Sequence, residues 1–164
     1  MNTLKLSVVK SRTDTYLGNE TRDVVDFLID GRNLIDIVRE IEQPFADGEG
    51  HPDIAGEYEG LPAEVTFLPS RHLLGDAHEW YESPSGEAAH KIVLLRCGSC
   101  GSDGCWPLLV KITATEGSVI WSDFEQPHRN YPELEEHKRW RYDGLGPFIF
   151  DRRQYEAELA SHSA

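Results

Sequence analysis

Cysteine is scarce in this chain of 164 residues, and its placement excludes a secreted disulfide framework. The three cysteines, Cys97, Cys100 and Cys105, all fall within nine residues. An odd, clustered set cannot staple distant parts of a small secreted fold. The thiols are therefore expected to be reduced, which predicts a cytoplasmic location.

Long apolar runs are also absent. No stretch approaches the roughly 20 apolar residues that a membrane-spanning helix needs, so no membrane association is predicted. The first ten residues alternate polar and apolar side chains, as a strand does and a signal peptide does not. The length fits one domain, residues 1–164, which is large enough to bury a core without disulfides.

Basic residues are few. The chain has 16 Lys and Arg against 29 Asp and Glu, for a net charge of −13. This shortage argues against a nucleic-acid partner, because phosphates are neutralised by Lys and Arg. The excess lies in residues 14–82, which hold 17 acidic residues against four arginines. Such a region would attract a basic protein partner; plain solubility is the alternative explanation.

Apolar periodicity predicts an α+β fold. Strands are expected at residues 4–8, 24–29, 90–97, 108–115, 119–124 and 148–150. Residues 90–97, 108–115 and 119–124 would form an antiparallel meander joined by short turns. The expected architecture is an antiparallel sheet of about five strands, with two main helices packed on one face.

The first helix is expected to begin at Leu34. Asn33 can cap its amino end, and apolar side chains then recur at helical spacing. Pro44 lacks the backbone N–H that a helix interior uses, so Gln43-Pro44 is expected to end the helix.

The second helix is expected to begin after Asp151. Gln154 stands three residues beyond this cap, which is the spacing of a capping box. Phe150 before the cap and Tyr155 in the first turns can form a hydrophobic staple. These signals predict a helix at the carboxyl end of the chain.

The cysteine turn is the first candidate for chemistry. Cys97-x2-Cys100 has the spacing of half a zinc site, Cys105 is a third thiolate, and His128 is the best-placed fourth ligand, ahead of His90. A second Cys-x2-Cys pair is missing, so the primary expectation is no cofactor, with zinc as the alternative. The thiols could instead serve as small hydrophobic side chains in a glycine-rich turn. Reversible oxidation of Cys97 with Cys105 is a further alternative.

Asp123, Glu125 and His128 form a second constellation. They could supply an acid, a base and an orienting group. No nucleophile stands at a known spacing, so a small hydrolase is the last alternative and the chain is expected to be non-enzymatic. Large aromatic and arginine side chains suit a protein interface. The binding candidates are Trp106, Trp121, Asp123, Arg129, Trp140 and Tyr142.

Three segments of the sequence form a recognisable pattern. They read C-G-x-x-G-C-W-P-L-L at 100–109, V-x-W-x-x-F-x-Q-P-H-R at 119–129 and L-G-P-F-x-F-D-x-x-Q-Y at 145–155. The pattern resembles a group of small uncharacterised bacterial proteins. The resemblance implies a bacterial origin and a shared fold, and it implies no activity. Cys97 lies outside the pattern.

Small acidic α+β proteins of this sort also resemble the immunity proteins of bacterial toxin systems, at the level of fold and charge. The leading hypothesis is a protein-binding domain that captures a partner through its acidic 14–82 region. A zinc-binding or thiol-active protein is the second hypothesis. The oligomeric state is not predicted.

Overall fold

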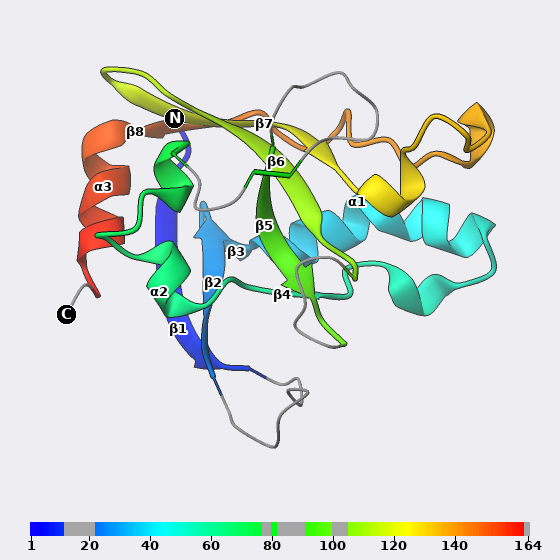
Figure 1. Ribbon diagram of the computed structural model, residues 1–164, viewed down its shortest axis with the longest axis horizontal. Coiled ribbons are helices and arrows are strands. Elements are labelled where there is room, and N and C mark those ends of the chain that lie inside the picture. The colour runs from blue at the N-terminus through cyan, green and yellow to red at the C-terminus, as the bar shows by residue number, and fades with distance from the viewer. Residues whose placement is uncertain (12–21, 77–79, 82–90, 100–104, 163–164) are drawn as a thin grey trace.

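The computed structural model describes residues 1–11, 22–76, 80–81, 91–99 and 105–162 (Figure 1). Within these residues the chain forms two antiparallel sheets and three α-helices, which confirms the predicted α+β class. The strands are β1 Leu4–Lys10, β2 Asp23–Ile29, β3 Arg32–Asn33, β4 Tyr58–Glu59, β5 Ile92–Cys97, β6 Leu108–Ala114, β7 Ser118–Glu125 and β8 Phe148–Asp151. The helices are α1 Leu34–Gly48, α2 Ala63–Thr66 and α3 Arg152–Ala160. In this part of the chain, no helix is long and apolar enough to cross a bilayer.

The five-stranded sheet has the order β4-β5-β6-β7-β8, with each strand antiparallel to its neighbour. The meander β5-β6-β7 agrees with the predicted one. β5 is buried along nearly its whole length, as its continuous apolar run requires of an interior strand. β1, β2 and β3 form a second, smaller sheet, which the sequence did not separate from the first.

One hydrophobic core is shared by both sheets and by the helices. Trp121 of β7 lies at its centre and is fully buried. Its ring packs edge-on against Phe27 of the smaller sheet at 5.8 Å and against Phe150 of β8 at 4.9 Å. Its Nε1–H donates to the hydroxyl of Tyr155 on α3 at 2.9 Å. Burying one such aromatic ring contributes about 1.5–3 kcal/mol. Because the ring contacts both sheets and α3, its burial stabilises their association.

The first helix begins as predicted and ends later than predicted. The side chain of Asn33 accepts a hydrogen bond from the N–H of Ile35 at 2.9 Å, which is the expected cap. The helix nevertheless continues through Pro44 to Gly48, so the predicted end at Gln43-Pro44 is wrong. Ala46 beyond the proline is fully buried, and Phe45 stacks on Trp140 at 6.2 Å. This long-range packing offsets the backbone hydrogen bond that proline cannot make.

The second main helix, α3, has the predicted cap and hydrophobic staple but not the complete capping box. Asp151 accepts from the N–H of Gln154 at 3.0 Å, and the rings of Phe150 and Tyr155 are 5.3 Å apart, so both features are confirmed. The capping box is not completed. The Gln154 side chain instead bonds both the N–H and the C=O of Leu4 on β1, because α3 packs against that strand.

Candidate functional site

The main candidate site is an acid-lined groove between the smaller sheet, α1 and the segment 56–59. It encloses about 800 Å³. Four carboxylates and two cationic side chains line it: Asp26, Asp36, Glu57 and Glu59, with Lys10 and Arg39. The lining therefore has an excess of negative charge, and all four acids come from the acidic region 14–82.

Close backbone contacts fix one wall of this groove. A Cβ on Gly60 would stand 1.7 Å from the carbonyl oxygen of Val25, so only glycine lets the chain pass β2 at this point. The N–H of Val25 donates to the carbonyl of Leu61 at 2.9 Å and holds the two segments together. On the other side, Tyr58 pairs with Cys97 of β5. The wall thus links the smaller sheet to the five-stranded one.

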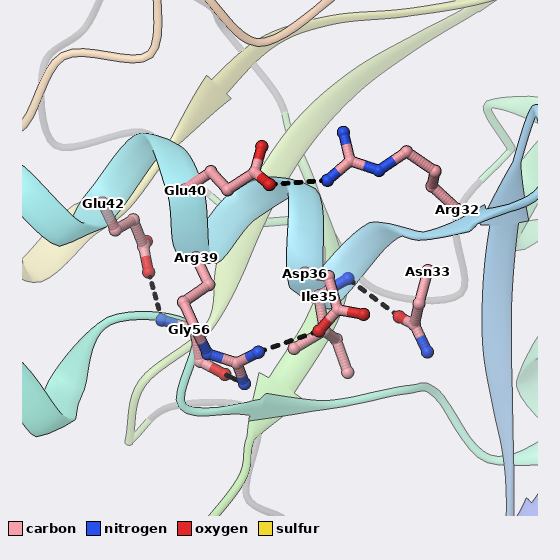
Figure 2. A network of polar contacts seen from close by, with 8 residues as sticks. All are labelled: Arg32, Asn33, Ile35, Asp36, Arg39, Glu40, Glu42 and Gly56. Carbon is pink, nitrogen blue, oxygen red and sulfur yellow. Dashed lines mark hydrogen bonds and ion pairs between the residues drawn. The ribbon is translucent and has the colours of Figure 1, made fainter.

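Side chains of α1 form the facing wall, and Figure 2 shows Arg39 and Glu42 of this helix reaching Gly56. Arg39 donates to Asp36 at 2.8 Å and to the carbonyl of Gly56 at 3.4 Å. Asp36 remains exposed at the rim, so its carboxylate is available to a second cation. A neighbouring exposed pair, Arg32 with Glu40 at 2.7 Å, is also seen in Figure 2.

The two acidic residues of segment 56–59, Glu57 and Glu59, differ in burial. Glu59 is buried, accepts from the hydroxyl of Ser11 at 2.8 Å and lies 3.9 Å from the guanidinium of Arg22. Glu57 is exposed, and its carboxylate accepts from Ser99 at 3.2 Å. Glu59 therefore anchors the segment, while Glu57 and Asp36 present charge at the rim.

A buried polar cluster supports the groove from behind. The fully buried Glu42 accepts hydrogen bonds from the hydroxyls of Tyr58, at 2.5 Å, and Tyr142, and from the N–H of Gly56 at 2.8 Å. Gln126 donates to the Tyr58 hydroxyl at 3.0 Å. Burial raises the pKa of Glu42, although the two tyrosine hydroxyls oppose this shift. Burial also raises the pKa values of both tyrosines, which therefore keep their protons and act as donors.

Sequence reasoning missed Glu42, although a signal was present. The buried positions of α1 are Leu34, Val38, Glu42 and Ala46, spaced four residues apart. An acid in such a stripe must find hydrogen-bond donors inside the protein, because an unpaired buried charge is costly. The partners could not be predicted, since they come from distant parts of the chain.

An aromatic cluster gathers several of the predicted binding residues beside the end of α1. Arg129 lies with its Cζ 5.0 Å from the Trp106 ring and 5.6 Å from the Trp140 ring. Its guanidinium makes two hydrogen bonds to Glu49, at 2.7 and 3.2 Å. Trp140 also donates to Glu49, at 2.9 Å, and the His128 ring stacks on Trp106 at 5.9 Å. Glu49 thus joins Arg129 to Trp140, and Trp106 joins the cluster by packing edge-on against Trp140 at 5.8 Å and under the Arg129 guanidinium.

The other predicted binding residues lie elsewhere. Trp121 is a fully buried core residue, so it cannot meet a partner's surface. Tyr142 is also buried, on Glu42. Trp140, although part of the aromatic cluster, is only 3% exposed, so it packs against the protein rather than projecting from it. Asp123 is exposed in a left-handed conformation (φ 54°), at a bulge where β6 and β7 change register.

The three candidate catalytic residues face different surroundings. Asp123 lines a hollow of about 430 Å³, whereas His128 lines another hollow of about 710 Å³. Glu125 is 1% exposed and pairs with the buried Lys91 at 3.1 Å. Asn130 donates to the second oxygen of this carboxylate at 2.8 Å. The ion pair gives Glu125 a structural role that its sequence position did not suggest.

The candidate zinc ligands fall partly outside the described residues, which do not include Cys100 or His90. Cys97 is buried at the end of β5, and Cys105 is exposed. The ring of His128 stacks on that of Trp106, the residue that follows Cys105. Among the residues with described positions, no three His, Cys, Asp or Glu are grouped as a metal site.

Comparison with known proteins leaves the site to be interpreted from its geometry. No family model, curated protein or solved structure matches the chain. The charge, shape and contacts of the groove are therefore the basis on which a function can be inferred.

Proposed function

We propose that this chain is a non-enzymatic protein-binding domain that docks a basic segment of a partner protein in the groove lined by Asp26, Asp36, Glu57 and Glu59. The groove supports this proposal because it concentrates carboxylates in a concave surface. Such a surface attracts Lys and Arg side chains and speeds their encounter. An immunity protein that blocks a basic toxin domain would work in this way.

The rim acids are suited to direct contact. Asp36 and Glu57 come from opposite walls, and both are exposed. An extended basic peptide between them could pair with both, while the supporting wall is fixed by Gly60 and by the buried Glu42 cluster. A preformed groove reduces the entropy that binding must offset.

The test is binding of a short fluorescent peptide rich in lysine and arginine, measured by anisotropy at low salt. The double variant Asp36→Asn/Glu57→Gln should weaken binding about tenfold or more, which corresponds to a loss of roughly 1.4 kcal/mol. The matched control, Glu116→Gln/Glu133→Gln, removes the same charge from two exposed sites outside the groove lining and should change affinity little. Equal weakening in both variants would mean that only net charge attracts the peptide, and would contradict the proposal.

A zinc or thiol function is the second candidate, and the position of His128 against Trp106 favours it. Cys97, Cys100 and Cys105 would supply thiolates, with His128 as the nitrogen ligand. Metal analysis of the purified chain tests this. Close to one equivalent of zinc, lost in Cys105→Ser, would support the zinc site, and metal-free protein in both forms would exclude zinc binding, leaving only the thiol chemistry.

We infer a bacterial, cytoplasmic setting from the sequence pattern and the clustered thiols. Both inferences are independent of the groove.

A further inference from the structure

We propose that the hollow beside the carboxyl end of α1 is a second site, which binds a small organic anion carrying a flat ring. This hollow is separate from the acid-lined groove and encloses about 710 Å³, within the size range of small-molecule pockets. Its walls are the end of α1 and the segment 128–140, which lie side by side in Figure 1.

The lining of this hollow is mainly basic, whereas the protein as a whole is acidic. Five of its lining side chains are basic: the cations Arg129 and Lys138, and the histidines His51, His128 and His137. Glu49 is the one acid in the lining among the described residues. In a chain of net charge −13, this is a local concentration of basic side chains. A hollow with that lining favours an anion and disfavours the cation that the groove would take.

Arg129 is fixed and still has donors to offer. Within the described part of the chain, its hydrogen bonds go to the two oxygens of Glu49 and, at 3.0 Å, to the carbonyl of His128. These contacts account for three of its five N–H groups. The flanking Trp106 and Trp140 hold the guanidinium plane in place. A guanidinium held in this way can donate to an anionic oxygen with little loss of entropy.

Lys138 supplies a cation whose present ion-pair partner, Glu135, a ligand anion could replace. Its ammonium is 3.8 Å from Glu135, and His137 is 3.5 Å from the same carboxylate. All three side chains are more than half exposed, so these pairs contribute little to stability. A ligand anion can therefore replace Glu135 at low cost.

Aromatic side chains account for the flat ring. Phe45 stacks on Trp140 with 22° between the ring planes, and both line the hollow. Tyr131 lines it too and is 37% exposed. Trp140 is itself covered by Phe45 and by Arg129. A planar group could therefore pack on the exposed Tyr131 and beside the partly buried Phe45, while its charged end meets Arg129 and Lys138.

The experiment is a titration of the full chain with phenyl phosphate, followed by two-dimensional NMR of backbone and indole N–H groups. Inorganic phosphate supplies the charge alone and phenol the ring alone. Phenyl phosphate should bind more tightly than either, with the largest shifts in the Trp140 indole and in residues 128–138. Absence of saturable binding, or shifts confined to other residues, would overturn the proposal.

Matched lysine variants sharpen the test. Lys138→Gln should weaken phenyl phosphate binding at least about threefold, as expected when one exposed charge is lost. Lys111→Gln removes a charge that is also exposed, on β6 and outside the hollow, and should leave the affinity unchanged. Equal weakening in the two variants would show general charge attraction and would refute a built site.

Discussion

Gly60 shows how strongly a single residue determines the shape of the groove. Its Cα lies so close to β2 that an added Cβ would overlap the carbonyl of Val25. Gly48, at the end of α1, has open space around the same position. The two glycines therefore differ in the role of the missing side chain.

Replacing each of these two glycines by alanine should change the free energy of unfolding very differently. Gly60→Ala must push β2 from the 58–61 segment, and we expect a loss of roughly 3 kcal/mol or more in the free energy of unfolding. Gly48→Ala should be neutral or stabilising by up to about 1 kcal/mol, because alanine favours a helix. Urea unfolding of both variants measures this. A Gly60→Ala protein as stable as the wild type would contradict the close packing.

The buried Glu42 should make stability depend on pH in a particular direction. Its folded-state pKa is raised above the usual value of 4.5 by burial, so the folded protein holds this proton more tightly than the unfolded chain does. The contribution is fully present below the unfolded pKa and is lost as pH rises through the folded pKa. Relative to Glu42→Gln, which cannot titrate, the wild type should therefore lose stability as pH rises above about 4.5.

Urea unfolding of wild type and Glu42→Gln across this pH range isolates the effect, because the other titrating groups are common to both. The stability difference between the two should narrow or reverse in favour of the variant as pH rises. A wild-type advantage that grows with pH would mean that the tyrosine hydrogen bonds outweigh burial, so that the pKa of Glu42 is lowered rather than raised.

Among the helices, α3 has the further role of completing the edge of the smaller sheet. Gln154 bonds both backbone groups of Leu4, and Glu158 accepts from the N–H of Leu6 at 2.8 Å. Side chains of a helix thus satisfy the backbone of β1, as a further strand would. This explains why Gln154 leaves the capping box unfilled.

Removing these side chains should loosen β1. We expect Gln154→Ala/Glu158→Ala to lose about 1–3 kcal/mol, because backbone donors lose their partners, and to speed hydrogen exchange at Leu4 and Leu6. Glu156→Ala is the control, since Glu156 pairs with Arg152 on the same helix at a partly exposed site. Unchanged exchange at Leu4 and Leu6 in the double variant would show that the helix does not hold the strand.

The elements predicted from sequence are those specified by local chemistry. Asn33 and Asp151 mark helix starts through hydrogen bonds to residues two or three positions away. The error at Pro44 has a long-range cause, because the next turn is held by Trp140, which lies almost 100 positions further along the chain. β4 was missed for a similar reason, since two residues form a strand only when β5 is already beside them.

For the protein as a whole, the sequence predicted the acidic character, but it predicted neither the acid-lined groove nor the hollow beside the end of α1. The groove requires β2, α1 and the segment 56–59 to meet, and no local pattern specifies that meeting. The aromatic cluster was half predicted: Trp106, Arg129 and Trp140 were all named as binding candidates, while Glu49, which joins two of them, was not. Contacts between distant segments therefore account for most of what the sequence could not predict.

The net charge of −13 should itself affect stability. Like charges repel in the compact state, and salt screens them over about 10 Å at 0.1 M. We therefore expect the melting temperature to rise with sodium chloride from low salt into the physiological range. Ion pairs such as Lys10 with Asp23 and Arg32 with Glu40 are exposed and contribute little. A melting temperature that falls with salt would mean that attractive pairs dominate instead.

Amide NMR can locate a bound basic peptide on the protein, and this measurement decides whether the groove is the docking site. Titration with the lysine- and arginine-rich peptide should shift the amides of Asp26, Asp36, Glu57 and Glu59, which line the groove. The exposed acids Glu133, Glu135 and Glu136 are an internal comparison of similar charge on another part of the surface. Largest shifts in the groove are the predicted result, and largest shifts at 133–136, or shifts spread evenly over all acidic residues, would contradict it.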